Sequence, residues 1–325
     1  MAWFLRALIA LVSLSFAAPS QAQTYPSHNI TVVVSIGPGT GMDVVARLYS
    51  EKLSAILGKP VVVENKPGAA TILAANQVAN APPDGHTLVV LTSSAMAINP
   101  SLYKQLPYDA ATSFVPISYY VKSPFILVVN PNLPAKTVAE FVKYAKETKP
   151  PLNYTTLGPG GIQHLTMEYA KLRLGFDANQ VPYRTTGQSI SDLAAGHVAT
   201  GFVEAGASLP LIRDGKLRAL AVSSSNRWPL LPDVPSMAEA TGMPDFETIS
   251  WHVLLAPAKT PRDIVERLHA EMKKIMSDPE MKEKVANIGL IPVDTPPVDG
   301  INAYMKDERA KWGALVEKLG LKGSQ

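Results

Sequence analysis

The residues most able to do chemistry in this sequence lie in two short loops rich in glycine and proline. The first reads GPGTGMD over residues 37–43, and the second reads GPGGIQH over residues 158–164. Each follows a strand-like run and precedes a helical pattern, so the first backbone N–H groups of the helix lack intrahelical partners. Such N–H groups, together with the helix dipole, form a seat for an anion. The alternative is that each loop is only a tight turn.

The residue types favour a carboxylate over a phosphate at the first loop. Met42 and Asp43 stand where a phosphate-binding P-loop has its lysine and its serine or threonine. The spacing also differs from the G-x-G-x-x-G pattern of dinucleotide-binding loops. Thr40 and Asp43 fit a capping box, which leaves other N–H groups between Gly39 and Met42 for a ligand. A carboxylate suits this site because Asp43 would repel a dianionic phosphate more strongly.

Motifs for catalysis are missing from the sequence. It contains no G-x-S-x-G, no H-E-x-x-H and no cysteine, and its six histidines are isolated. We therefore expect no enzyme activity, no cofactor and no metal site. His86 and His197 follow glycine in turns and are expected at the surface, whereas His164 either donates to a ligand or caps its own helix. Ser93 and Ser94 end a strand and can donate hydroxyls, but neither has a paired base that would make it a nucleophile.

Two similar α/β halves are expected to position the loops. The first half has strands expected at 31–36, 60–64 and 87–91 and helices expected at 42–57 and 71–79. Residues 151–203 repeat this order of strand, Gly-Pro-Gly loop, helix and strand. Alternating short strands and helices indicate a parallel sheet covered on both faces. Since ligands bind at the carboxyl ends of such strands, two facing lobes would bring both loops to one cleft.

Two apolar strands are expected to connect the halves as a hinge, FILVVNP at 125–131 and LRALAVSS at 217–224. A strand at 251–257 and three helices follow, of which the first has Thr260 as its expected cap and the others begin near Pro279 and Pro297. Domain 1 is therefore expected over 23–124 and 226–325, and domain 2 over 125–225. A chain of 325 residues is long enough for two such cores.

Charge and the N-terminus restrict the partners and the location. The net charge is only +3, and no basic tract is present, so nucleic acid and anionic membrane surfaces are poor partners.

Residues 1–22 contain Arg6, an apolar run over 7–18 and small residues at the end. This pattern predicts a secretory signal cleaved after Ala22. The apolar run is shorter than the roughly 20 residues of a membrane span. Without cysteine, the exported protein must be stable through burial alone.

Segments along the whole chain, from Tyr25 onward, carry a family resemblance. They include VVVSIGPGTGMDVVARL, LGKPVVVENKPGAA, PPDGHTL, INPSLYKQLPYD, VPYRTTGQSISDLAAGHV, LPDVPSMAEATG and SWHVLLAPAKTP. In this order they resemble the Bug/TctC family, the extracytoplasmic solute receptors of tripartite tricarboxylate transporters. The resemblance implies a type II periplasmic-binding (Venus-flytrap) fold of two α/β lobes joined by two crossover strands. It further implies a periplasmic monomer that captures a small carboxylate and delivers it to the large and small subunits of a membrane permease.

The resemblance also implies which residues bind the ligand. In the family, the two loops hold one carboxylate through backbone N–H groups and ordered water, and the segments equivalent to 92–95 and 185–187 complete the pocket. The position of Glu204 and the strand around Trp251 face the variable end of the ligand. The expected binding residues are Gly39, Thr40, Gly41, Met42, Asp43, Thr92, Ser93, Ser94, Ala95, Gly160, Gly161, Gln163, His164, Arg184, Thr186, Gly187, Glu204 and Trp251.

Two departures from the family pattern leave the ligand open. Gly161 stands where the family often has a serine or threonine, so backbone or water must replace that hydroxyl. Glu204 follows a strand that commonly ends in aspartate; it either pairs with a ligand amine or, as we favour, is turned outward or bridged by water. Arg184 either clamps a distal carboxylate or holds its lobe. We expect a small carboxylate, with an aliphatic or aromatic dicarboxylate favoured. A ligand-sensing module for a sensor kinase and an enzyme on the same fold are the alternatives.

Overall fold

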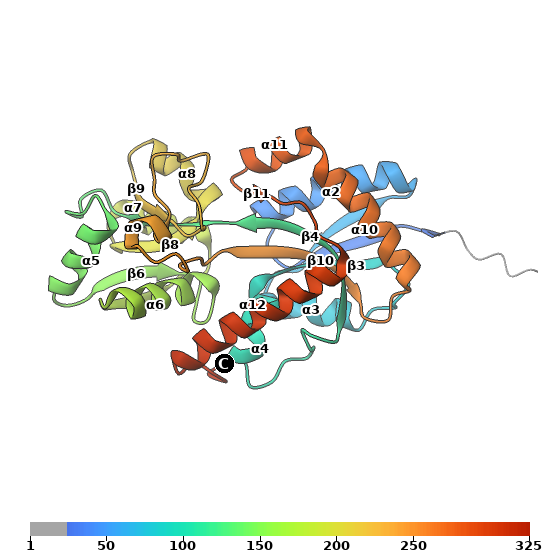
Figure 1. Cartoon of the computed structure of the whole chain (residues 1–325), viewed down its shortest axis with the longest axis horizontal. Coiled ribbons are helices and arrows are strands. Elements are labelled where there is room, and N and C mark those ends of the chain that lie inside the picture. Colours follow the sequence, from blue (N-terminus) through green and yellow to red (C-terminus); the bar gives the residue numbers. More distant parts are fainter. Residues whose placement is uncertain (1–24) are drawn as a thin grey trace, which may run out of the picture.

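The computed structural model describes residues 25–325, and the expected signal segment at 1–22 lies outside the described residues. Figure 1 shows two lobes side by side, each built on one β-sheet. Lobe 1 holds the six-stranded sheet with the order β11-β4-β10-β3-β1-β2, and lobe 2 holds the five-stranded sheet with the order β7-β6-β8-β5-β9. The expected architecture of two α/β lobes is therefore confirmed.

Lobe 1 contains both ends of the described chain. Its strands are β1 (Ile30–Val34), β2 (Val61–Asn65), β3 (Thr87–Thr92), β4 (Phe114–Ser123), β10 (Ser250–Pro257) and β11 (Ile291–Pro292). Its helices are α2 (Gly41–Leu57), η1 (Ala69–Thr71), α3 (Ile72–Ala79), η2 (Ser94–Ile98), α4 (Asn99–Leu102), α10 (Arg262–Ser277), α11 (Pro279–Asn287) and α12 (Val298–Lys318). Alternate residues of β1 face opposite sides of the sheet, so Val32 and Val34 pack under α2 and α10 while Val33 packs under α3.

Lobe 2 repeats the opening topology of lobe 1. Its strands are β5 (Phe125–Val129), β6 (Leu152–Thr156), β7 (Ala178–Pro182), β8 (Thr200–Glu204) and β9 (Arg218–Val222). Its helices are α5 (Val138–Glu147), α6 (Ile162–Leu174), α7 (Thr186–Ala195), α8 (Ala205–Arg213) and α9 (Met237–Thr241). β6 pairs in parallel with β7 and β8, as β1 pairs with β2 and β3. The predicted repeat of strand, loop, helix and strand is confirmed.

The connections between the lobes differ in part from the expected boundaries. Only Pro124 separates β4 in one sheet from β5 in the other. On the return, however, α9 packs against α5 and β9, and Arg173 of lobe 2 forms an ion pair with Asp245 at 2.8 Å. The chain therefore rejoins lobe 1 at Ser250 and not at residue 226, because the apolar side chains of 226–249 are buried against lobe 2.

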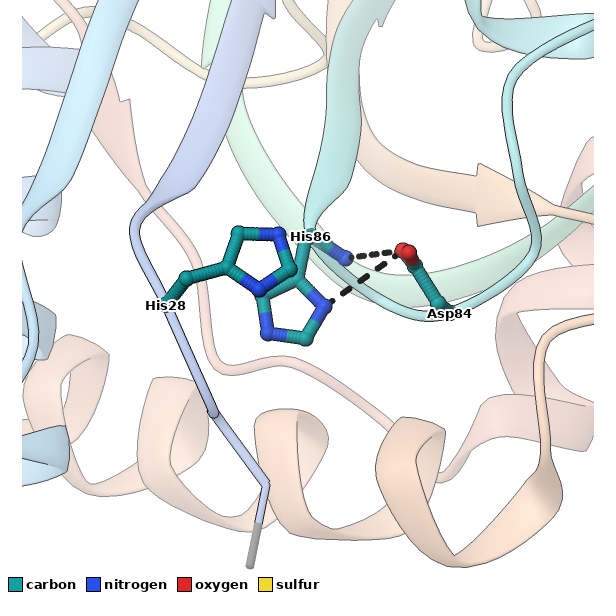
Figure 2. Close-up of side chains that lie close together, drawn as sticks. All are labelled: His28, Asp84 and His86. Atoms are coloured by element: carbon teal, nitrogen blue, oxygen red, sulfur yellow. Dashed lines mark hydrogen bonds and ion pairs between the residues drawn. The ribbon is translucent and has the colours of Figure 1, made fainter. Parts of the chain in front are cut away.

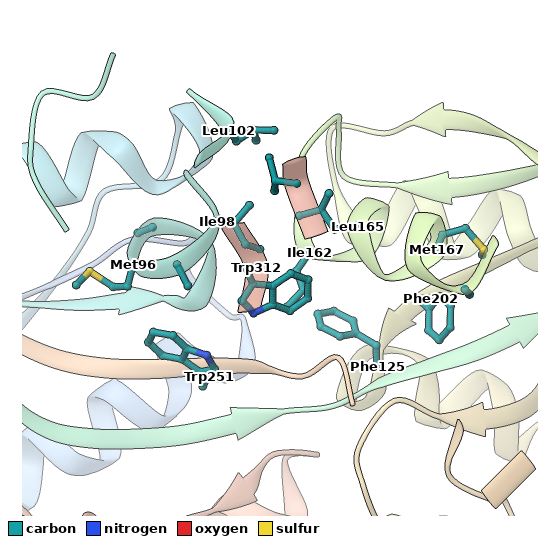
Figure 3. Close-up of a cluster of buried hydrophobic side chains, with 14 of the residues drawn as sticks. Met96, Ile98, Leu102, Phe125, Ile162, Leu165, Met167, Phe202, Trp251 and Trp312 are labelled. Atoms are coloured by element: carbon teal, nitrogen blue, oxygen red, sulfur yellow. The ribbon is translucent and has the colours of Figure 1, made fainter. Parts of the chain in front are cut away.

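One apolar cluster continues from lobe 1 into lobe 2 beside the gap between them. Figure 3 shows Ile98 and Leu102 from lobe 1 near Ile162 and Leu165 from lobe 2, with Trp312 of α12 between them. Gly160 makes this approach possible, because a Cβ at that position would lie 2.1 Å from Leu102 Cδ2. The two lobes are thus in direct contact next to the loop at 158–164.

The structure confirms the expected start of α11 at Pro279 but not the expected cap of α10. Asp278 caps α11 by accepting hydrogen bonds from the N–H groups of Glu280 and Met281. Thr260 was expected to cap α10, and this prediction is wrong. Its hydroxyl is buried without a hydrogen-bond partner among residues 25–325, and the helix begins after Pro261.

Candidate ligand-binding cleft

A cavity of about 600 Å³ lies between the lobes at the carboxyl ends of β1, β3 and β6. Lobe 1 contributes the loop before α2, the end of β3 and parts of β4 and β10. Lobe 2 contributes the loop before α6 and the start of α7. Nine of the expected binding residues line it: Thr40, Thr92, Ser94, Gly160, Gly161, Gln163, Arg184, Thr186 and Glu204. Both glycine loops therefore meet one cavity, as their positions after parallel strands predict.

The first loop is held by its own side chains. Thr40 Oγ1 accepts from the N–H of Asp43 at 3.4 Å and donates to the carbonyl of Gly37 at 2.9 Å. Asp43 Oδ2 accepts from the N–H of Gly39 at 2.9 Å, so the carboxylate reaches past Thr40 instead of completing a capping box. The N–H of Gly39 is therefore occupied within the loop.

Asp43 serves this loop and does not face the cavity. Arg47 and Asn65 also donate to its carboxylate, at 3.0 and 2.8 Å, and the residue is buried. Burial raises the pKa of Asp43, but the hydrogen bonds from Arg47, Gly39 and Asn65 outweigh burial and lower the pKa below its ordinary value. The structure thus explains how a carboxylate can sit beside an anion site, since its charge is already compensated.

The start of α2 keeps free donors. Met42 has its side chain fully buried in the core of lobe 1, so only its backbone can contact a ligand. In the described part of the chain, the N–H groups of Gly41 and Met42 have no hydrogen-bond partner. These are the first-turn groups that a helix leaves unpaired.

The second loop repeats the arrangement with a different side chain. Gly160 donates its N–H to His164 Nδ1 at 3.0 Å, so His164 caps its own loop. Burial lowers the pKa of His164, with Glu168 opposing this effect, and the neutral ring is the form that can accept this bond. The alternative of His164 as a ligand donor is not what the structure shows. In both loops a glycine N–H binds the side chain four residues later, which leaves the next N–H groups for a ligand.

The inner wall of the cavity departs from the prediction at Trp251. Its side chain is fully buried, and its indole N–H donates to Glu308 Oε2 at 2.8 Å on α12. Because successive residues of a strand face opposite sides, Ser250 and His252 line the cavity instead. The prediction that Trp251 faces the ligand is therefore wrong. The residues immediately before and after it line the cavity.

Other expected residues of this wall are also buried away from the cavity. Ser93 is fully buried and lies 3.3 Å from Ser250 Oγ, and Ala95 belongs to the apolar core. Several cavity residues were not expected from the sequence, namely Ile36, Asn99, Leu102, Ser123, Phe125, Leu157, Ser250 and His252. Ser250 and His252 could have been found from the sequence, because alternate residues of a strand face the same side and both flank Trp251.

Glu204 lines the cleft and is not turned outward, which is one of the two arrangements favoured from the sequence. Ser123 Oγ donates to its Oε1 at 3.2 Å, and burial raises the pKa of Glu204 above its ordinary value. A second cavity of about 590 Å³ adjoins the first and shares Thr40, Thr186 and Glu204 with it. Gly39, Gly41 and Gly187 line this second cavity. The two cavities therefore meet along these shared residues.

His28, Asp84 and His86 form a side-chain group with the spacing of metal ligands, at the opposite edge of lobe 1 (Figure 2). These residues lie just before the amino ends of β1 and β3, whereas the cavity lies at the carboxyl ends of the same strands. The two rings are stacked 3.7 Å apart, and the N–H of Ser27 donates to His86 Nε2 at 3.2 Å. Because this hydrogen bond occupies the Nε2 lone pair and Nδ1 faces Asp84, the ring as placed leaves no free lone pair on Nε2 for a metal ion.

Both histidines that follow glycine in turns, His86 and His197, were expected at the surface, but only His197 is exposed. His86 is only 8% exposed, because it is covered by the stacked His28 ring and by Tyr25, so its expected place at the surface is wrong. His197 is exposed, as expected.

Over residues 25–325, each helix is too short or too polar to serve as a membrane span.

Comparison with known proteins identifies the family. The family model "Tripartite tricarboxylate transporter family receptor" (TctC) matches residues 45–321. Protein BugT of Bordetella pertussis is 34% identical over 315 residues, which cover 97% of this chain and 96% of BugT. Two solved structures from Rhodopseudomonas palustris are also similar. Rpa4515 with adipate has 32% identity and a TM-score of 0.82, with coverage of 91% and 98%. MatC with bound malate has 30% identity and a TM-score of 0.79, with coverage of 90% and 100%.

The family model matches residues of both lobes, and the solved structures named above cover 90% or more of the chain. The periplasmic binding protein BugD has the same arrangement, with a TM-score of 0.81, 31% identity and coverage of 92% of this chain and 99% of BugD. The fold is therefore the two-lobed type II periplasmic-binding fold expected from the sequence. The chain belongs to the TctC family of tripartite tricarboxylate transporter receptors and is a periplasmic solute-binding receptor of the Bug/TctC type.

Proposed function

We propose that the protein captures a small organic carboxylate between its lobes and delivers it, chemically unchanged, to the large and small membrane subunits of a tripartite tricarboxylate transporter. The main support is that α2 and α6, from different lobes, begin at the same cavity. Their first N–H groups are available to an anion. A dicarboxylate is favoured because Arg184 lines the cavity and offers a cation to a second carboxylate. The adipate and malate held by the two relatives support this ligand class.

The energetics are those of a receptor that collects a dilute nutrient. A hydrogen bond to a charged group contributes about 1.5–3 kcal/mol, and a helix end adds about 0.3–1 kcal/mol. Four or five such contacts, reduced by the cost of association, give about −8 kcal/mol, which corresponds to micromolar binding. Since the contacts come from both lobes, the ligand favours the closed state, which the membrane subunits would recognise.

A thermal-shift screen against mono- and dicarboxylates tests the ligand class. A ligand at about 100 times its dissociation constant stabilises the folded protein by about 2.7 kcal/mol. The proposal predicts a higher melting temperature with at least one carboxylate, and recovery of that compound unchanged. Stabilisation by an amine or a sugar, with none from any carboxylate, would refute it.

A substitution at the start of α2 tests the anion seat directly. Gly41→Pro removes one N–H at the first helical position, where proline is well tolerated. The preceding Thr40 already has φ −73° and ψ 158°, an extended conformation that proline allows. We expect a loss of affinity of about 10- to 150-fold with an intact fold by circular dichroism. Gly41→Ala is the matched control, because it adds a Cβ near Leu290 but keeps the N–H.

Export and transport need separate tests. We propose that residues 1–22 are removed on export to the periplasm, and mass spectrometry of the periplasmic protein should then find Gln23 as the first residue. Uptake of the radiolabelled carboxylate by intact cells should stop when the genes for the membrane subunits are deleted. Uptake that continues in the deletion strain would contradict the assignment to this transporter.

A further inference from the structure

Two polar side chains lie side by side in the inner wall of the cavity. Thr92 is the last residue of β3, and His252 is its direct partner in the antiparallel pairing of β3 with β10. Both line the cavity. Cross-strand partners have Cβ atoms about 4.5–5.5 Å apart, so one small polar group can reach both side chains.

Both side chains are buried and leave hydrogen-bonding capacity unused. Thr92 is 7% exposed and His252 is 3% exposed. Thr92 Oγ1 and His252 Nδ1 have no hydrogen-bond partner among residues 25–325. Buried polar atoms are nearly always paired with protein, water or ligand, so this pair is incomplete as the cleft stands.

The chemistry of the surrounding wall favours an uncharged partner. Burial lowers the pKa of His252 to about 4, so the ring is neutral near neutral pH and offers one donor and one acceptor. Glu204, in the same wall, has its pKa raised by burial. The cation of the cavity wall, Arg184, comes from a loop of lobe 2 and not from the strands that carry this pair.

We propose that Thr92 and His252 form a specificity subsite for an uncharged oxygen substituent, a hydroxyl or keto group, on the captured carboxylate. This inference rests on the proposed function, because it concerns a second part of the same ligand. A hydroxyl both donates and accepts, and a keto oxygen accepts from the threonine hydroxyl and from an imidazole N–H. A ligand that carries only methylene groups at this point leaves both side chains unpaired.

Matched pairs of carboxylates that differ by one oxygen test the subsite. Isothermal titration would compare malate, as each enantiomer, with succinate, and mandelate with phenylacetate. A site built to hydrogen-bond an oxygen disfavours the analogue without it, and we expect at least one hydroxy acid to bind about tenfold or more tightly than its partner. Thr92→Val and His252→Phe should each reduce that preference to within about twofold.

The stability of the unliganded variants separates this role from a structural one. Thr92→Val removes a buried hydroxyl without a partner, so its melting temperature should rise while the preference for the hydroxy acid falls. Thr260→Val is the matched control, because Thr260 Oγ1 is also buried without a partner but lies outside the cavity. It should raise the melting temperature and keep the preference.

The outcomes for this subsite and for the proposed function differ. Equal binding of the two members of each pair by the unsubstituted protein would overturn the subsite and leave carboxylate capture standing. The subsite is also refuted if both Thr92→Val and His252→Phe keep the preference. If other carboxylates bind but neither hydroxy acid does, the subsite is refuted as well. Failure of every carboxylate in the wider screen would instead overturn the proposed function, and the subsite with it.

Discussion

Gly206→Ala should weaken ligand binding by obstructing the contact between the lobes. Gly206 is the second residue of α8 in lobe 2, and Gly289 lies in the turn between α11 and β11 of lobe 1. A Cβ at Gly206 would lie 2.6 Å from the carbonyl oxygen of Ile288 and 3.6 Å from Gly289 Cα. Both neighbours are backbone atoms, so no side-chain rotation can relieve the contact.

The size of the effect follows from this overlap. A carbon–oxygen contact needs at least about 3.3 Å, so the two backbones must separate by roughly 0.7 Å. Excess volume in a packed contact costs about 1–3 kcal/mol. Here this cost destabilises the closed state, in which the two lobes are in contact. Affinity should therefore fall by about 5- to 150-fold. The open state gains up to about 1 kcal/mol, because alanine is the better helix former.

Three measurements on the purified protein check this reasoning. Titration calorimetry with the carboxylate found in the screen gives the affinity, which should fall. Small-angle scattering with saturating ligand gives the radius of gyration, which should exceed that of the unsubstituted complex. The melting temperature without ligand should stay the same or rise. Gly300→Ala is the control, since it adds alanine to α12 with a contact only to the side chain of Pro296.

The refuting result is specific. If Gly206→Ala binds as tightly as the control and the scattering of the two complexes agrees, the contact between Gly206 and the Ile288–Gly289 turn is not part of the ligand-bound state. A lower melting temperature without ligand would also contradict the reasoning, because it would place the cost in the fold and not in closure.

Two further predictions concern buried ionisable groups. Burial lowers the pKa of His252 from 6.5 to about 4, so between these values the unfolded chain binds more protons than the folded one. The free energy of unfolding should therefore fall by about 3 kcal/mol as the pH drops from 6.5 to 4, and denaturant titrations of His252→Phe should show a flatter profile. Glu204, with a raised pKa, contributes in the opposite direction. Asp43→Ala leaves the donors of the first loop unpaired, and should lower the free energy of unfolding by about 2–3 kcal/mol and reduce carboxylate affinity. An unchanged melting temperature in that variant would contradict the loop-holding role.

The repeated strand, loop and helix of each lobe could be predicted because their signals are local. Apolar runs, glycine punctuation and helical periodicity all act within about ten residues. The membership of 226–249 in lobe 2 could not be predicted in this way, since it depends on α9 packing against α5, nearly a hundred residues earlier. Similarly, the role of Asp43 requires Asn65 from the neighbouring strand.

The error at Trp251 has a clear physical reason. All eight residues of β10 are buried, so burial does not show which side faces a ligand, and polar and apolar residues alternate only at its start, over Ser250, Trp251 and His252. One side packs on α12, where Glu308 receives the indole N–H, and the other side closes the cavity. The pairing of β3 with β10 sets the register of this buried strand and places His252 beside Thr92, on the side of the cavity.

In both loops a glycine N–H donates to a side chain of the same loop. This explains how the loops can hold an anion without a positively charged side chain. If every N–H of a glycine loop pointed to the ligand, the empty loop would lose its hydrogen bonds and its shape. Here one N–H in each loop is bound by the side chain four residues later, Asp43 in lobe 1 and His164 in lobe 2. The loop conformation is thereby fixed before the ligand arrives, and only the N–H groups at the helix starts remain for it. Such preorganisation reduces the entropy lost on binding, so neutral donors can suffice for micromolar affinity.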